Sequence, residues 1–275
     1  MPGELPFVIR EIGLIMKIKF FFFIFFLSVI LSLPVVGQNY PDGYTEALEA
    51  FQRKDYNASL ESVRSYFDPA SKSYEFRMLA ASNYMNLGNY ETAITHLSYC
   101  RTENPLRAEP LLLTAVALRK SGNLYGAARE IIQGINRYPQ NVQFRIEMAR
   151  VYFLLSKFPE ARAQLDVALK LHPNHLHAMY LDGLIFIKQG RYEEAEFRLK
   201  NVLGMKSLSV SLLPPLHNNL GLVLERLGEI SLKSSDRDNA VLRFKESEDH
   251  YKKALSYNSE HPVYRRNLAR VSLHL

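Results

Sequence analysis

Small and large apolar residues recur along the middle of the chain with a period of 34 residues. Two columns hold small residues, namely Ala81, Ala115, Ala149 and Gly183 in the first and Ala93, Ala127, Ala161 and Ala195 in the second. Two columns hold large apolar residues, namely Tyr84, Leu118, Tyr152 and Phe186 in the first and Leu97, Ile131, Leu165 and Leu199 in the second. Between the small columns, Gly88, Gly122 and Gly190 tolerate the left-handed backbone that ends a helix. Pro105, Pro139 and Pro173 stop the second helix before the next period begins.

This pattern resembles the tetratricopeptide repeat, whose unit of 34 residues is a helix, a tight turn and an antiparallel helix. The resemblance implies an all-α fold, a right-handed superhelical solenoid of helix-turn-helix repeats. It covers nearly all of residues 38–275, in six repeats followed by a C-terminal capping helix over residues 262–275. The predicted repeats are residues 40–73, 74–107, 108–141, 142–175, 176–209 and 214–261.

The first and last repeats depart from the pattern. In the first repeat, Lys54 and Ser59 stand where the columns call for glycine and alanine. The last repeat carries an insertion, which we expect to lengthen each of its helices by about two turns. The apolar pattern continues through Ile230 and Leu232 on one side and through Val241 and Phe244 on the other. Residues 234–239 then form a polar tip, with Asp238 predicted to cap the second helix.

An apolar run over residues 20–33 follows Lys17 and Lys19 and precedes Pro34. This layout is typical of a secretory signal peptide over residues 1–37, with Met16 as a possible start and Gln38 as the first mature residue. The alternative is an uncleaved membrane anchor, since the run is near the lower length limit of a spanning helix. We therefore expect a periplasmic or secreted protein, or alternatively one anchored in the inner membrane and facing the periplasm. The membrane is a partner only if the segment is uncleaved.

Charge and cysteine content narrow the candidate functions. The chain has a net charge of +6, but its basic residues are spread along the sequence without the clustered stripe that nucleic-acid binding requires. Nucleic acid is therefore not an expected partner. The single cysteine, Cys100, excludes an intramolecular disulfide and a zinc or iron–sulfur site built from cysteines. Because Cys100 lies in a column of small residues, we expect a buried packing thiol.

The sequence contains no zinc-protease motif, nucleophile elbow or phosphate loop, so we expect no enzyme and no cofactor. His172, His175 and His177 could hold a metal ion, and an enzyme that uses them with a metal is a third functional hypothesis. These histidines also lie at a turn between repeats, where polar residues are usual, and we expect no metal site. Residues 236–239 lack the glycine and the distal glutamate of a calcium loop and are interpreted as a polar hairpin tip.

The first helix of each repeat should present its remaining face to the inside of the solenoid. These inner positions are mostly apolar, with a basic residue about once per repeat; they are Met78, Leu112, Val116, Arg119, Ile146, Arg150, Phe153, Tyr180, Leu184, Lys188, Asn218 and Leu222. An exposed apolar patch of this kind marks a partner site, unless a tight superhelix or self-association covers it. The family's subset that grips acidic C-termini needs polar residues where Met78, Leu112 and Leu113 stand, so that mode is not expected.

The leading hypothesis is an exported, non-enzymatic scaffold that binds a peptide or protein partner in this groove. Phe153, Tyr180 and Leu184 are predicted to form one apolar strip, bordered by Arg119, Arg150 and Lys188, that favours an acidic or carboxyl-terminal group. The lengthened hairpin near residues 229–241 is a competing docking site. The alternative function is a membrane-anchored periplasmic repeat protein that assists assembly or maintenance of an envelope complex.

Overall fold

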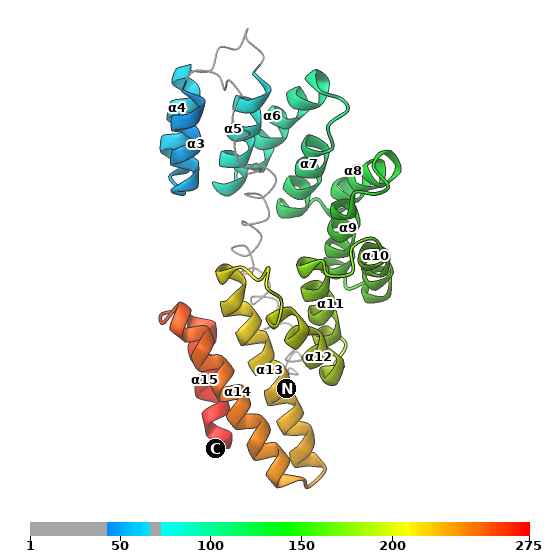
Figure 1. Ribbon diagram of the computed structural model, residues 1–275, viewed down its shortest axis with the longest axis vertical. Helices are drawn as coiled ribbons and strands as arrows, with labels where there is room; N and C mark the ends of the chain where they lie inside the picture. The colour runs from blue at the N-terminus through cyan, green and yellow to red at the C-terminus, as the bar shows by residue number, and fades with distance from the viewer. Residues whose placement is uncertain (1–42, 67–72) are drawn as a thin grey trace, which may run out of the picture. The chain divides into compact units, whose positions relative to one another are not determined.

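The computed structural model describes residues 43–66 and 73–275, and every regular element in these residues is a helix (Figure 1). The all-α fold built from helix-turn-helix repeats is thereby confirmed. The signal segment predicted over residues 1–37 lies outside the described residues. The chain forms two compact units that divide between Ala178 and Met179, and each is described by itself.

The first unit consists of four antiparallel helix pairs. Their bounds are α3 (Tyr44–Gln52), α4 (Tyr56–Tyr66), α5 (Tyr74–Asn86), α6 (Tyr90–Glu103), α7 (Glu109–Lys120), α8 (Leu124–Arg137), α9 (Val142–Leu154) and α10 (Phe158–Leu171). The side chains of Asn89 and Asn123 cap α6 and α8 by accepting hydrogen bonds from the backbone N–H groups of Thr92 and Gly126. Each pair lies within the limits of one 34-residue period.

The turn between the two helices of a repeat has a left-handed residue at a fixed position. Gly88, Gly122 and Gly190 have φ of 81°, 90° and 72° there. Lys54 and Ser156 occupy the same repeat position without being glycine, and their φ values are 65° and 58°. The left-handed turn is therefore kept where its glycine is absent, because helix packing on both sides determines the backbone at this point.

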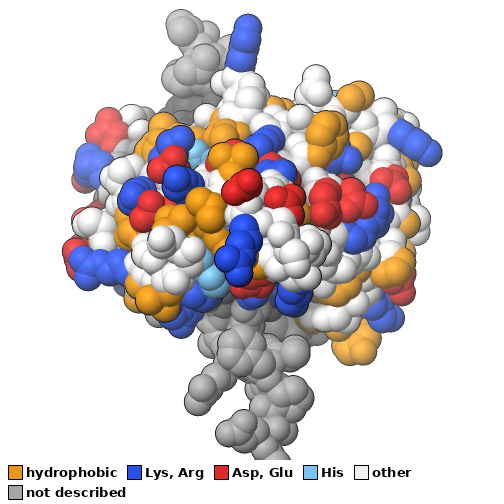
Figure 2. Space-filling view, turned by 90° about the horizontal axis from the view of Figure 1, so that it is seen from below, with side chains coloured by type: hydrophobic (Ala, Val, Ile, Leu, Met, Phe, Trp, Pro, Cys, Tyr) orange, Lys and Arg blue, Asp and Glu red, His pale blue; other side chains and the backbone are white. Residues whose placement is uncertain are grey.

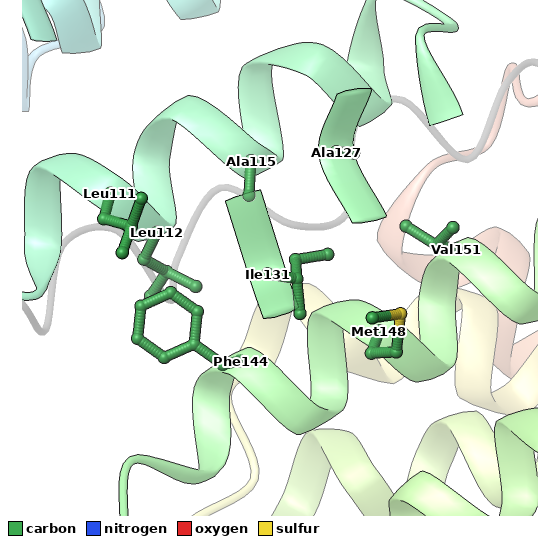
Figure 3. Packing of buried hydrophobic residues seen from close by; sticks show 8 residues of the cluster. All are labelled: Leu111, Leu112, Ala115, Ala127, Ile131, Phe144, Met148 and Val151. Carbon is green, nitrogen blue, oxygen red and sulfur yellow. The ribbon is translucent and has the colours of Figure 1, made fainter. Parts of the chain in front are cut away.

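The core of the first unit lies between successive helix pairs. Side chains from α7, α8 and α9 meet in one cluster (Figure 3), which consists of Leu111, Leu112, Ala115, Ala127, Ile131, Phe144, Met148 and Val151. A Cβ atom placed on Gly134 of α8 would lie 2.1 Å from the ring of Phe144. The close approach of α9 to α8 therefore leaves no room for a side chain at position 134.

Ser59 shows how the first repeat accommodates a polar residue in a column of small ones. Its side chain is fully buried, and its hydroxyl donates a hydrogen bond of 2.7 Å to the carbonyl oxygen of Ala47. The same hydroxyl accepts a bond of 2.8 Å from Nδ2 of Asn83. A buried hydroxyl that is bonded in both directions costs little, so serine replaces alanine here without loss of the repeat.

The second unit continues with longer helices. Its elements are α11 (Leu176–Lys188), within which the division falls, α12 (Tyr192–Leu203), η4 (Val210–Leu212), α13 (Leu213–Lys233), α14 (Arg237–Tyr257), α15 (Pro262–Val271) and η5 (Ser272–His274). The helices α13 and α14 have 21 residues each, compared with 12 in α12, so the insertion is helical on both sides of the turn. None of the helices among residues 43–66 and 73–275 is both long and apolar enough to cross a membrane.

The lengthened α13–α14 hairpin packs closely along its whole length. A Cβ atom on Gly221 or Gly228 would lie 2.7 Å from the rings of Tyr251 or Phe244, respectively. Asp236, and not the expected Asp238, caps α14, because the Asp236 carboxylate accepts the N–H of Asn239 at 3.2 Å. The turn residue Ser235 takes the left-handed conformation (φ 64°), which places the cap one position after it.

Candidate partner-binding surface

The twelve predicted inner residues lie on the first helices of the repeats, α5, α7, α9, α11 and α13. Seven of them are buried, namely Met78, Leu112, Val116, Ile146, Arg150, Tyr180 and Asn218. Arg119, Phe153, Leu184 and Leu222 are half-buried, and Lys188 is exposed. The expectation of a solvent-exposed inner face therefore holds for only part of the set.

A buried ion cluster occupies the inner face of α7 and α9. Arg119 Nε donates to a carboxylate oxygen of Glu147 at 2.8 Å, and Arg150 donates to the other oxygen. Burial opposes ionisation of Glu147, but the two guanidinium groups outweigh it and lower the pKa of this carboxyl to about 2. Both arginines that were expected to border the groove therefore bind a carboxylate of this chain.

The three histidines near the turn before α11 do not converge on one point. His172 is exposed, whereas His175 and His177 are half-buried, with ring centroids 6.1 Å apart. Nε2 of His175 lies 3.0 Å from the side-chain amide of Gln143. Burial, with the charge of Arg150 acting in the same direction, lowers the pKa of His175 to about 4 and that of His177 to about 3. Both rings are uncharged at neutral pH.

Within residues 43–66 and 73–275, a metal-like grouping of ligand atoms is formed by Glu225, Glu229 and His274. Glu225 is fully buried, and both of its oxygens accept hydrogen bonds of 2.6 Å from Arg270. One of these oxygens also accepts the hydroxyl of Tyr251 at 2.8 Å. Because a cation would have to displace the guanidinium group, this carboxylate serves to bind α15 to the hairpin.

Cys100 is fully buried, as its place in a small-residue column predicts. Burial raises the pKa of its thiol to about 12, with the charge of Glu103 adding to the effect. Since the thiolate is the reactive form, this cysteine is inert at neutral pH.

In the second unit, two of the predicted inner residues are held by polar contacts. Asn219 donates a hydrogen bond of 2.8 Å to the hydroxyl of Tyr180. Asn218 accepts one of 2.9 Å from Asn267 of α15. Tyr180 is therefore not a free aromatic anchor. The predicted strip of Phe153, Tyr180 and Leu184 remains a prediction, because Phe153 belongs to the first unit and the other two residues to the second.

The surface carries charges of both signs. Figure 2 shows basic and acidic side chains interspersed on one face, with hydrophobic side chains between them. Among the described residues, charged side chains form ion pairs on single helices or between neighbouring ones, such as Arg191 with Glu194 at 2.5 Å and Arg243 with Glu196 at 2.9 Å. An exposed pair such as Arg191 with Glu194 contributes little to stability.

Sequence reasoning missed the ion pairs that Glu147 and Glu225 form. Glu147 lies three residues before Arg150, a spacing that allows an ion pair on one helix and could have been recognised. Glu225 and Arg270 are 45 residues apart in the chain, and no local signal connects them. The contact between His217 and His250 likewise depends on how α13 and α14 pair.

The comparisons with known proteins agree with the repeat pattern. The model of the tetratricopeptide repeat family matches residues 78–142 and 146–199. No curated protein matches the chain. Many solved structures do, and three are described here.

A thermophilic tetratricopeptide repeat protein of Thermus thermophilus is 20% identical, with a TM-score of 0.56 over 73% of this chain and 100% of the other. A tetratricopeptide repeat protein of Parabacteroides merdae is 15% identical, with a TM-score of 0.63 over 91% and 90%. A chain of the APC/C hetero-tetramer Cut9–Hcn1 is 13% identical, with a TM-score of 0.66 over 83% of this chain and 42% of the other. Residues 78–142 and 146–199 therefore match the tetratricopeptide repeat family, and the chain has the all-helical repeat fold of these solved proteins.

Proposed function

We propose that the chain is a non-enzymatic scaffold that binds a peptide or protein segment along the inner face of α5, α7 and α9. Tetratricopeptide repeats generally serve protein–protein interaction, and one of the matched structures is a complex of two different proteins. This proposal concerns the first unit, where three successive first helices carry most of the predicted inner residues.

The proposal rests on a difference in burial between the first and the second helices of the repeats. The second helix α6 buries one stripe, consisting of Ala93, Leu97 and Cys100. In contrast, α7 buries all residues from 110 to 117, and α9 all residues from 146 to 151. Since 3.6 residues complete a turn, α7 and α9 have apolar or paired side chains on every side, including the side of the predicted inner residues. We infer that an apolar segment of a partner contacts this side at Phe153, which is only half-buried.

The buried polar contacts of the predicted inner residues limit which substitutions can test the proposal without destabilising the fold. Because Arg150 binds Glu147 in a buried position, reversing its charge would place two carboxylates side by side and destabilise the fold. Tyr180→Ala would free the amide of Asn219 and leave a cavity. Phe153 is half-buried, and truncating it preserves the buried polar contacts.

Phe153→Ala is expected to reduce partner binding at least about tenfold, since apolar anchors carry most of the energy of an interface. The measurement is photo-crosslinking in cells, with a photoreactive residue at Leu154, which is 40% exposed and lies in the same repeat column as Lys188. The matched control is Phe197→Ala on the second helix α12, where the ring is 66% exposed. Circular dichroism of both variants should match the unaltered protein.

The identity of the cross-linked product distinguishes a partner bound at the inner face from self-association of this chain. A cross-link from position 154 to a second copy of this chain would mean that self-association covers the inner face. An equal yield from a photoreactive residue at the exposed Tyr125 would contradict a specific inner site.

The α13–α14 hairpin is a second candidate docking site. Four apolar side chains near its tip are 40–55% exposed, namely Ile230, Leu232, Val241 and Leu242. The helix α15 lies along the hairpin and ends before its tip (Figure 1). Deleting residues 227–233 and 237–243 removes about two turns from each helix and keeps the turn between them. Loss of the cross-link in this deletion, with retention in Phe153→Ala, would favour the hairpin.

The proposed scaffold is an exported protein, periplasmic or secreted, whose mature chain begins at Gln38. This rests on the basic, apolar and small-residue layout of residues 17–37. Mass spectrometry of the protein purified from its native cells should give Gln38 as the first residue. Recovery of the intact apolar segment in the membrane fraction would favour instead an anchored protein that assists an envelope complex.

A further inference from the structure

Two histidines face each other across the base of the α13–α14 hairpin, the end opposite its turn. Nδ1 of His217 and Nδ1 of His250 are 2.9 Å apart, and the ring centroids are separated by 5.1 Å. His217 is buried and His250 half-buried. A bond between two Nδ1 atoms requires one ring to donate Nδ1–H and the other to accept with an unprotonated nitrogen. The contact therefore exists only while one of the two Nδ1 atoms lacks a proton.

The charged groups around the pair are mostly basic. They are Lys253 and Asp249 on α14 and Lys200 on α12, and the ring of Tyr257 stacks on that of His217. Burial lowers the pKa of His250 to about 4, and the charges of His217, Lys253 and Lys200 act in the same direction, against Asp249. Burial, with Lys253, also lowers the pKa of His217. Both rings are thus uncharged at neutral pH.

We propose that His217 and His250 form an acid-sensitive clasp, which holds the start of α13 against the end of α14 at neutral pH and releases it in acid. When both rings carry a proton, two Nδ1–H groups point at each other beside two lysines. Neither ring can then accept a hydrogen bond, and among the described groups named above Asp249 alone offsets the positive charge. Separation of the rings exposes both to water and relieves the repulsion.

The direction in which pH changes the stability of the closed hairpin follows from proton binding in the closed and the open hairpin. An exposed histidine takes a proton near its ordinary pKa of about 6.5, whereas His250 in the closed hairpin resists protonation until about pH 4. Between these values the open state binds more protons than the closed state. The closed hairpin is therefore at full stability above about pH 6.5 and loses it progressively as the pH falls toward 4.

Hydrogen exchange in the full chain tests the clasp. Between pH 7 and pH 4.5, amides at the start of α13 and the end of α14 should lose protection about tenfold or more, after correction for intrinsic exchange. In His250→Gln the amide can still bond to His217 but cannot take a proton, so most of this acid-induced loss should disappear. The matched control is His172→Gln, at an exposed histidine of the first unit, which should behave like the unaltered protein.

A histidine titration followed by NMR provides the second readout and needs no variant. The clasp requires His250 to titrate well below its ordinary range. Titration of His250 near pH 6.5, or equal acid-induced loss of protection in the unaltered protein and in His250→Gln, would overturn the proposal. If circular dichroism shows that His250→Gln does not fold at pH 7, His217→Gln takes its place.

Discussion

Replacing Arg270 by alanine should lower the free energy of unfolding by roughly 3 kcal/mol. The change leaves the fully buried carboxylate of Glu225 without its cation and with only the hydroxyl of Tyr251 as a partner. We place the effect at the lower end of the range for buried ion pairs, because the Arg270 side chain is 38% exposed and water can reach the gap. Urea denaturation followed by circular dichroism measures the loss.

Two further variants separate charge from packing at this site. Arg270→Lys keeps the charge but not the paired hydrogen bonds, and should lie between the alanine variant and the unaltered protein. Glu225→Gln combined with Arg270→Met removes both charges and should recover part of the stability. A change below about 0.5 kcal/mol in Arg270→Ala would show that the pair does not bind α15 to the hairpin.

Ala127→Leu should lower the free energy of unfolding by about 1–3 kcal/mol and shift the melting temperature by several degrees. Ala127 is fully buried between α7 and α9, in the cluster that includes Ala115 and Met148. A larger side chain must push these helices apart, and an interior repeat supports neighbours on both sides. Ala161→Leu, at the same column of the next repeat, should act in the same direction.

Arg129→Leu is the control for the added side chain, since Arg129 lies two residues further along the same helix in an exposed position. Its effect should stay within about 0.5 kcal/mol. Equal melting temperatures for Ala127→Leu and Arg129→Leu would mean that the alanine column does not form the contact between repeats.

The repeat period is the part of the fold that the sequence predicts best. A column that must be small, such as Ala127, reflects the direct approach of one helix to the next, and such contacts recur at a fixed spacing. The turn position is also periodic, although Lys54 and Ser156 show that glycine is a sufficient and not a necessary signal for the left-handed backbone. The cap of α14 was misplaced by two residues, because Asp236 and Asp238 are equivalent by residue type alone.

The candidate site was harder to predict, because its properties depend on pairings between distant residues. The sequence places Arg119 and Arg150 on the inner face. Both of them bind Glu147, and this carboxylate offsets part of the positive charge that a partner would meet. The sequence predicts that Tyr180 is an aromatic anchor, but its hydroxyl accepts a hydrogen bond from Asn219 within the chain. The contact between His217 and His250 depends on how α13 and α14, with 21 residues each, are aligned along one another. The period of the apolar residues does not determine this alignment.

The helix α15 affects whether a second copy of the chain can stack its helix pairs on this one. It packs against the α13–α14 hairpin and buries Tyr264, Asn267 and Val271 against its own chain. Its other side carries Arg265, Arg266 and Ala269, all exposed. Another copy's helix pair would have to bury these two guanidinium groups to stack there, at a desolvation cost that no apolar contact repays. Stacking of another copy on this side of α15 is therefore disfavoured.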